Sequence, residues 1–179
     1  MAKIQDTLIC VVGPSGCGKS TMSGAMVKKY PQLSEVWSMT TRPARYPNEP
    51  GHIYVTKEEF DKHEMVAYTM FDGNEYGVPA SMLDDADFYV IDIEGVKTLR
   101  DRYAGKKLVV VYLDVTPDVA AERMKKRGDS DEKIEKRLAN DAIMFSDIKG
   151  LAPDYIIDAN RNEDTVRADF ESIVCKYLL

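Results

Sequence analysis

Apolar residues are arranged along the chain in two alternating patterns. Short, nearly continuous apolar runs are typical of buried parallel strands, whereas apolar residues spaced three or four apart are typical of helices. The first pattern predicts strands at residues 7–12, 52–56, 65–71, 88–93, 107–115 and 154–158. The second predicts helices at residues 21–30, 57–63, 79–85, 96–103, 117–126, 131–145 and 163–179. Strands that alternate with helices predict an α/β fold, a three-layer sandwich with a parallel central sheet.

Two regions do not follow this alternation. Residues 38–85 begin with a cluster of hydroxyl and arginine side chains and continue into a turn-rich stretch. Residues 123–150 carry charged helical patterns with several arginines. We therefore expect these two regions to be phosphate-handling flaps on a core made of residues 1–37, 86–122 and 151–179.

Composition and charge narrow the class of protein. A chain of 179 residues can bury one hydrophobic core, and a net charge of −6 argues against a nucleic-acid partner. No apolar run approaches the ~20 residues that cross a bilayer, and the first residues lack the apolar segment of a signal peptide. The three cysteines are scattered and odd in number, so we expect no disulfide framework and a cytoplasmic location.

The most informative motif is GPSGCGKS at residues 13–20, which lies between a predicted strand and a predicted helix. Its glycines permit backbone angles that let successive amides surround an anion, and the helix adds its positive dipole end. Lys19 supplies a cation for the β- and γ-phosphates, and Ser20 a hydroxyl for Mg²⁺. This context predicts a P-loop NTPase fold that binds a nucleoside triphosphate. The predicted binding residues of the segment are Gly13, Ser15, Gly16, Cys17, Gly18, Lys19, Ser20 and Thr21.

Five segments, in chain order, resemble the guanylate kinase family. They are residues 13–20; Ser38 with TTRP at 40–43 and Arg45; GNEYG at 73–77; IDI at 91–93 with GV at 95–96; and Arg123 with RG at 127–128 and KRL at 136–138. The first is generic, whereas the second and third are much more specific to this family. The resemblance spans nearly the whole chain and implies a monophosphate-binding region at residues 38–85 and a lid at residues 123–150.

The resemblance also implies roles for residues on the acceptor side. Arg42 and Arg45 resemble the pair that grips the acceptor monophosphate, and two guanidinium groups suit the several oxygens of a dianion. Tyr54 and Tyr76 are similar to tyrosines whose hydroxyls bind the same phosphate. Asp92 ends an apolar run, where a carboxylate is costly unless a cation or hydrogen bonds meet it. In the family this position helps to organise Mg²⁺ or the acceptor nucleotide.

On the donor side, Arg123, Arg127 and Arg137 resemble lid arginines that close over the transferring phosphoryl group. A lone arginine is usually a solvated surface charge, but here the order of the motifs favours a functional assignment. Arg123 has an alternative role, bracing the lid helix through an ion pair. We expect catalytic roles for Lys19, Arg42, Arg127 and Arg137, and a nucleotide contact for Arg123.

Two positions depart from the family pattern, and both concern the nucleobase. Guanine presents donors at N1 and the 2-amino group and an acceptor at O6, so its pocket needs a carboxylate and a hydroxyl. Counting from the GNEYG segment, these groups fall on Ala67 and Val78, whose side chains cannot hydrogen-bond. Ser38 keeps its hydroxyl, and Glu94 is a candidate substitute for the acidic residue. Apolar pockets discriminate weakly between substrates, so we expect relaxed or redirected choice of base.

These observations predict an ATP- and Mg²⁺-dependent nucleoside monophosphate kinase, with GMP or dGMP as the first expected acceptor. The alternative enzyme is a related kinase for a pyrimidine or modified deoxynucleoside monophosphate, or for a phosphorylated ribose. The alternative from another class is a non-catalytic guanylate-kinase-like module that binds phosphopeptides, against which the intact P-loop argues. We expect no nucleic-acid or membrane partner, and either a monomer or a homodimer.

Overall fold

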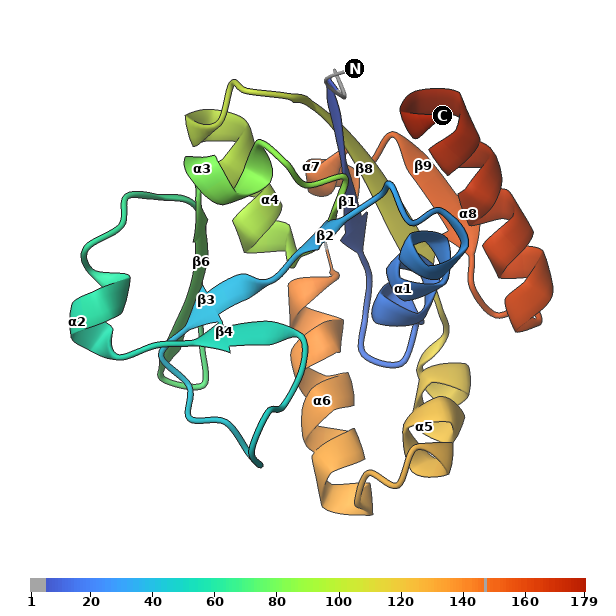
Figure 1. Cartoon of the computed structure of the whole chain (residues 1–179). Coiled ribbons are helices and arrows are strands. Elements are labelled where there is room, and N and C mark those ends of the chain that lie inside the picture. Colours follow the sequence, from blue (N-terminus) through green and yellow to red (C-terminus); the bar gives the residue numbers. More distant parts are fainter. Residues whose placement is uncertain (1–5, 147) are drawn as a thin grey trace.

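The centre of the molecule is a five-stranded parallel sheet in the order β2-β7-β1-β8-β9 (Figure 1). The structure is a computed structural model that describes residues 6–146 and 148–179. The strands are β1 (Thr7–Val12), β2 (Glu35–Val36), β7 (Phe88–Val90), β8 (Lys107–Asp114) and β9 (Tyr155–Asp158). Every residue of β1 is buried, because β7 and β8 flank it and helices cover both of its faces. This position explains its continuous apolar run.

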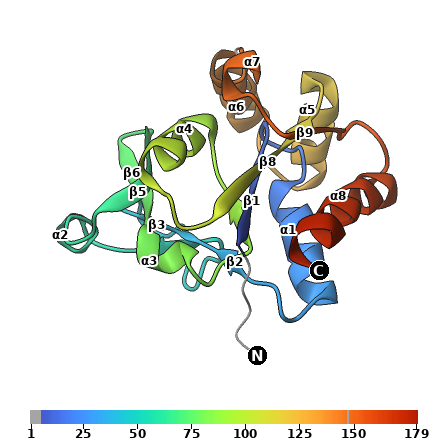
Figure 2. The same cartoon turned by 90° about the horizontal axis from the view of Figure 1, so that it is seen from above.

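Helices form a layer on each face of this sheet (Figure 2). One layer contains α1 (Lys19–Lys29), α5 (Pro117–Lys126) and α8 (Glu163–Leu178), whose apolar side chains join one hydrophobic cluster with β1 and β8. The other contains α4 (Ile93–Arg102), whose buried residues join a second cluster. The three-layer α/β sandwich expected from the sequence is therefore confirmed.

A second sheet lies on the far side of α4 (Figures 1 and 2). Its order is β4-β3-β6-β5, with β3 (Ser38–Thr40), β4 (His52–Tyr54), β5 (Met65–Phe71) and β6 (Asn74–Pro79). Two short helices accompany it, α2 (Lys57–Phe60) and α3 (Ala80–Leu83). The β5–β6 hairpin turns at Asp72 and Gly73, both with positive φ, as a two-residue hairpin turn requires.

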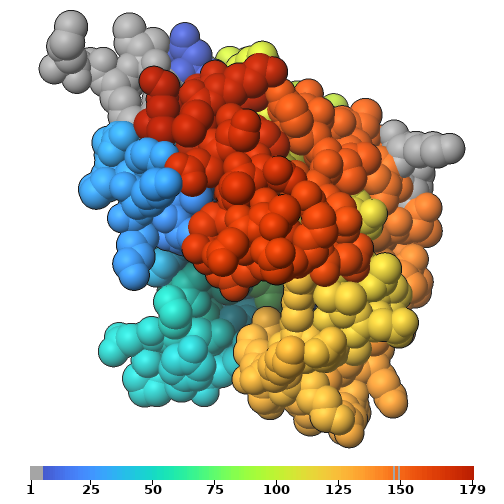
Figure 3. All heavy atoms as spheres, turned by 90° about the vertical axis from the view of Figure 1, so that its right-hand side faces the viewer, coloured from blue at the N-terminus to red at the C-terminus, as the bar shows by residue number. Residues whose placement is uncertain are grey.

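The remaining helices are α6 (Asp131–Met144) and α7 (Ile148–Leu151). Ser130 caps α6, because its hydroxyl accepts a hydrogen bond from the Lys133 amide. Figure 3 shows α5 and the start of α6 projecting on one side of a cleft, opposite the segment near residue 50. Within the described ranges, no helix is long and apolar enough to cross a bilayer.

Most elements lie close to their predicted positions, whereas four were missed. The bounds predicted for α5 and β5 are those observed, and β8 differs by one residue. The strand predicted at residues 88–93 is wrong at its end, since β7 stops at Val90 and Asp92 caps α4 by accepting from the Gly95 amide. The sequence pattern did not reveal β2, β3, β6 or α7.

Candidate active site

The loop between β1 and α1 has the backbone of an anion-binding turn. Gly16 and Gly18 have φ of 75° and 101°, which side chains disfavour. A Cβ at Gly16 would also lie 2.8 Å from the Ala120 carbonyl oxygen, so glycine is required there for space as well. Gly18 is the N-cap of α1, which places the free amides of that helix beside the loop.

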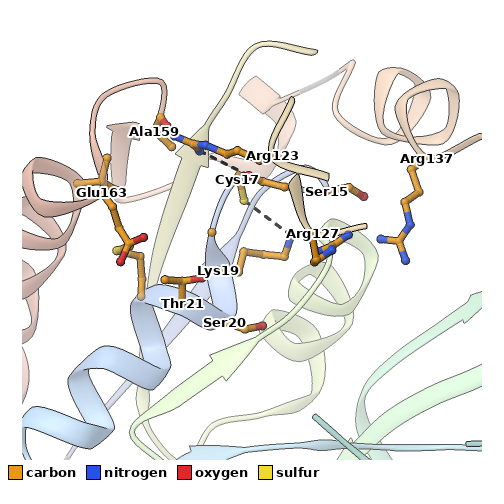
Figure 4. A pocket seen from close by; sticks show the side chains of 14 residues that line it. Ser15, Cys17, Lys19, Ser20, Thr21, Arg123, Arg127, Arg137, Ala159 and Glu163 are labelled. Carbon is orange, nitrogen blue, oxygen red and sulfur yellow. Dashed lines mark hydrogen bonds between the residues drawn. The ribbon is translucent and has the colours of Figure 1, made fainter. Parts of the chain in front are cut away.

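Lys19 folds back over this loop (Figure 4). Its Nζ donates to the carbonyl oxygens of Gly13 at 2.6 Å and Pro14 at 3.0 Å. Within residues 6–146 and 148–179 it forms no salt bridge with a carboxylate. The ammonium group is therefore held only by neutral acceptors, which a phosphate oxygen can replace.

A cavity of about 410 Å³, here called the P-loop cavity, lies between this loop, α5, α6 and the start of α8 (Figure 4). Every predicted nucleotide-binding residue lines it except Gly13, which lines the second cavity described below. The three predicted lid arginines also line it. Its lining is Ser15, Gly16, Cys17, Gly18, Lys19, Ser20, Thr21, Met22, Arg123, Arg127, Arg137, Ala159, Glu163 and Val166.

The three arginines differ in what they contact. Arg123 donates to the carbonyls of Ala159 at 2.7 Å, Arg161 at 3.3 Å and Gly16 at 3.5 Å. It thus braces α5 through carbonyl groups, and it forms no ion pair, its alternative role, with the residues that the structure describes. Arg127 pairs with Asp129. Arg137 forms no hydrogen bond or ion pair with any residue in the described part of the chain. Burial and the positive charge of Arg127 both lower the pKa of Arg137. A half-buried guanidinium group without a partner is a strong sign of an anion site.

A second cavity, of about 280 Å³ and here called the flap cavity, lies between the P-loop and the second sheet. It is lined by the predicted residues Ser38, Tyr76 and Asp92, and by others that were not predicted. Ser15 and Lys19 line both cavities. The two cavities therefore meet at the P-loop. The remaining lining residues are Gly13, His52, Tyr68, Thr69, Phe71, Tyr89, Val90, Ile91, Gly95, Asp141, Met144 and Phe145.

The wall of the flap cavity carries neutral and acidic polar groups. The Ser38 and Tyr89 hydroxyls lie 2.8 Å apart and are buried. Asp92 accepts from the Gly95 amide at 2.6 Å and from the Thr69 hydroxyl, while burial raises the pKa of its carboxyl group. Burial lowers the pKa of His52, whose Nδ1 is buried without a partner.

The predicted phosphate-binding arginines, Arg42 and Arg45, both contact the carboxylate of Glu49, which was not predicted from the sequence. Arg42 Nη2 lies 2.9 Å from Glu49 Oε1, and the Arg45 amide donates to Oε2 at 2.7 Å. Arg42 also donates to the Tyr54 hydroxyl at 3.0 Å. The hydrogen bond from Arg42 lowers the pKa of Glu49 to about 2.

This arginine cluster adjoins the flap cavity without lining it. His52 packs edge-on against Tyr54 and Tyr76, with ring centroids 6.2 Å and 5.4 Å away, and so links the two. Arg42, Arg45 and Tyr54 are not among the cavity's lining residues. The only sequence signal for Glu49 is its spacing, seven and four residues after the two arginines.

Three residues at positions expected to contact the nucleobase lie away from the flap cavity. Glu94 is exposed and pairs with Lys97 at 2.7 Å. Ala67 and Val78 face each other across the β5–β6 ladder and are 1% and 0% exposed, within the apolar cluster of α4. The structure does not bring any of the three to the cavity wall.

One contact across the P-loop was also missed. The Ser15 amide donates to Asp141 Oδ2 at 2.8 Å, from α6. Asp141 lies four residues after Arg137, one helical turn further along. A carboxylate thus already occupies one of the amides that the loop offers to anions.

Comparisons with known proteins show which proteins this chain is similar to. Residues 9–144 match the AAA domain family. A protein of Symbiobacterium thermophilum named guanylate kinase is 30% identical over 181 residues, which cover 93% of this chain and 82% of the relative. A guanylate kinase of Vibrio parahaemolyticus is 31% identical over 183 residues, covering 94% and 86%. The crystal structure of guanylate kinase from Anaplasma phagocytophilum has the same fold, with a TM-score of 0.67 at 22% identity, covering 100% of this chain and 90% of that one.

Proposed function

The chain belongs to the guanylate kinase family, and we propose that it transfers the γ-phosphoryl group of ATP to GMP or dGMP. The products are ADP and GDP or dGDP. The observation that carries this proposal is that two cavities share Lys19 and Ser15 at the P-loop. A triphosphate in one cavity and a monophosphate in the other would meet at the Lys19 ammonium group.

In this transfer the protein mainly positions the substrates and neutralises charge, and it takes little part in covalent chemistry. An oxygen of the acceptor phosphate attacks the γ-phosphorus, and the bond to the oxygen that bridges to the β-phosphate breaks. Lys19 exchanges its loop carbonyls for phosphate oxygens, and Arg137 supplies a charge that no protein group uses within the described ranges. These cations stabilise the charge on the transferring group.

The residues at the mouth of the P-loop cavity fit Mg²⁺. Ser20 is exposed there, and its hydroxyl makes no hydrogen bond to other described residues, so it is free to be a ligand. Mg²⁺ usually takes one or two protein ligands and completes its shell with phosphates and water, and when bound it neutralises phosphate charge. Within the described residues no group of three His, Cys, Asp or Glu could hold a metal, which agrees with such a sparse site.

Asp92, the other predicted metal ligand, fits the acceptor better. It lines the flap cavity, and its carboxylate is already held by the Gly95 amide and the Thr69 hydroxyl. We assign it to the acceptor nucleotide.

We further propose that residues 38–85 form the monophosphate-binding region and residues 123–150 the lid, and that both close during the reaction. Closure excludes water, which would otherwise hydrolyse ATP. Arg137 lies on α6 and the arginine pair lies beside β3, so closure would bring both sets of cations toward the P-loop. We expect a cytoplasmic enzyme, monomeric or homodimeric; its cysteines, Cys10, Cys17 and Cys175, are unpaired.

A panel of acceptors tests the proposal. The protein is incubated with ATP and Mg²⁺ and with GMP, dGMP, AMP, dTMP, dUMP or dCMP in turn, and ADP and the new diphosphate are quantified by chromatography. With GMP or dGMP, ADP and the new diphosphate should form in equal amounts. The rates should be well above those with the other acceptors. Preference for a pyrimidine would favour the related kinase, and acceptor-independent ADP release would contradict monophosphate transfer. Binding of a phosphopeptide with no turnover of any acceptor would favour the scaffold.

A further inference from the structure

This inference rests on the proposed function and concerns a histidine that lies between the two acceptor-side tyrosines. We propose that His52 is a further ligand of the acceptor phosphate, and that its ring takes up a proton when the acceptor binds. Acceptor binding is then coupled to a proton through a residue outside the arginine pair.

Strand pairing places His52 next to the tyrosines predicted to bind the phosphate. His52 and Tyr54 are two residues apart in β4, so their side chains lie on the same face of the strand. Thr40 of β3 pairs with Tyr54 on one side and with Tyr76 of β6 on the other, which brings Tyr76 to that face as well (Figure 1). The His52 ring contacts both tyrosine rings edge-on, with centroids 6.2 Å from Tyr54 and 5.4 Å from Tyr76.

One nitrogen of the His52 ring is left for a ligand. His52 lines the flap cavity, and its Nδ1 is buried without a hydrogen-bond partner among the described residues. A buried polar atom without a partner costs free energy, which a ligand in the cavity can offset. A protonated imidazole donates from both of its nitrogens. Because Arg42 and Arg45 lie in the same cluster, the ligand expected there is an anion.

The groups beside His52 keep its ring uncharged in the free protein. Burial is the main cause of its lowered pKa, followed by the charge of Arg42, and Arg45 adds to the effect. Glu49 and the Ser38 backbone act in the opposite direction. Both arginines pair with Glu49, so the cluster has one net positive charge. A histidine with a pKa below the ordinary value of about 6.5 is neutral at pH 7.

The other walls of the flap cavity also carry titratable groups. They come from the P-loop, β5, β7, the start of α4 and α6, and they are Lys19, Tyr68, Tyr89, Asp92 and Asp141. None of them is among the main causes of the pKa of His52. Burial raises the pKa of both tyrosines, so they are uncharged at neutral pH. The charge next to His52 is therefore set mainly by the arginine pair and Glu49.

A bound phosphate reverses this charge. A phosphate dianion turns the net positive charge of the cluster into a net negative one, and a nearby negative charge favours the protonated imidazole. Above pH ~6 the proton comes from solvent. At lower pH the phosphate already carries a proton, which passes to the ring, so no net uptake remains. Acceptor binding should therefore weaken as pH rises from about 6 to the pKa that His52 has in the complex.

The pKa of His52 in the free and the bound protein tests the inference directly. The chain has two histidines, so a pH titration followed by NMR gives two imidazole signals, which His63→Gln assigns. The pKa of His52 should lie below 6.5 in the free protein and rise above about 7 with GMP. Guanosine, which has no phosphate, should leave it unchanged.

The pH dependence of the acceptor KM gives a second readout. In the wild type, KM for GMP should rise about fivefold between pH 6.5 and 8, whereas in His52→Gln it should stay within about twofold. His63→Gln is the matched control, because His63 is exposed beside Glu59 and does not line the cavity. It should keep the wild-type profile. The melting temperature of each variant checks its fold, and the wild-type titration decides if His52→Gln does not fold.

Two results of the titration would overturn this inference: a pKa of His52 that GMP does not change, or one that guanosine raises as much as GMP does. A KM for GMP that is raised equally at every pH in His52→Gln would also overturn it, because the ring would then only support the second sheet. GMP is still phosphorylated in each of these cases, so the proposed function stands. A wild-type protein that phosphorylates no monophosphate would overturn the proposed function and this inference with it.

Discussion

The two cavities that meet at the P-loop differ in whether their cationic side chains are paired with carboxylates. In the P-loop cavity Arg137 has no partner in the described part of the chain, and Lys19 donates to two carbonyls and the Cys17 sulfur, none of them a carboxylate. Beside the flap cavity, Arg42 and Arg45 are already paired with Glu49. Under the proposed function, the donor side could receive a polyanion directly, whereas on the acceptor side Glu49 already holds the two arginines predicted to bind phosphate.

Asp141 connects the two sides. It lines the flap cavity and accepts from the Ser15 amide of the P-loop, while Arg137 on the same helix lines the P-loop cavity. A movement of α6 therefore changes a negative and a positive group at once. Asp141 is therefore an internal anion at the P-loop, and its effect on nucleotide binding can be tested.

The largest effect is expected at Lys19. Lys19→Ala should lower kcat by on the order of 10²-fold or more, because it removes a charge that stabilises the transition state. Lys28→Ala makes the same change at an exposed position on the same helix and should leave kcat unchanged. Turnover near wild type in folded Lys19→Ala protein would remove the P-loop from the mechanism.

The acceptor side is tested next, by Arg42→Ala. The loss of a charged hydrogen bond should raise KM for GMP by about 10- to 150-fold, equivalent to about 1.5–3 kcal/mol, with KM for ATP nearly unchanged. Steady-state kinetics with each substrate varied in turn measure both constants. A rise in KM for ATP alone would mean that the two cavities have been assigned the wrong way round.

A smaller effect is expected at Asp141. Asp141→Asn keeps the shape of the side chain and removes a negative charge next to the loop that binds the triphosphate. We expect KM for ATP to fall by up to about tenfold, since the Ser15 amide then loses a charged competitor. Glu135→Gln makes the same kind of change on an exposed face of α6 and should have no such effect. An increase in KM for ATP would show that Asp141 supports nucleotide binding.

The smallest effect concerns stability and pH. The pKa of Glu49 is lowered to about 2 by Arg42, with help from the Arg45 amide, and Tyr54 and His52 lie in the same cluster. A carboxyl group with a lowered pKa stabilises the fold above its unfolded pKa of about 4.3, and that contribution is lost as pH falls toward 2. The Tm difference between wild type and Glu49→Gln should therefore be largest near pH 6 and shrink below pH 4. A difference that does not depend on pH would contradict the ion pair.

The P-loop and the long elements could be predicted because their signals are local. The motif at residues 13–20 and the apolar runs of β1 and β8 occupy consecutive positions. In contrast, β2 and β3 are two and three residues long and exist because neighbouring strands pair with them. So short a segment carries no periodicity of its own.

The polar contacts of the site could not be predicted because they join distant parts of the chain. Ser15 and Asp141 are 126 residues apart, and Ser38 and Tyr89 are 51 apart. In the sequence, Tyr89 looked like one more apolar residue of a strand. Its hydroxyl contact with Ser38 at the wall of the flap cavity is visible only in the structure. Glu94 was a candidate because it is an acidic residue near the end of a predicted strand, but α4 begins at Ile93, and Glu94 is exposed and pairs with Lys97.

Direct transfer of the phosphoryl group from one cavity to the other can be followed with labelled phosphate. The protein is incubated with [γ-³²P]ATP, Mg²⁺ and GMP, and the nucleotides are separated by thin-layer chromatography. We expect the label to leave ATP only when GMP is present and to appear in the β-phosphate of GDP. Label found in inorganic phosphate whether or not GMP is added would contradict it, because the two cavities would then not serve one reaction.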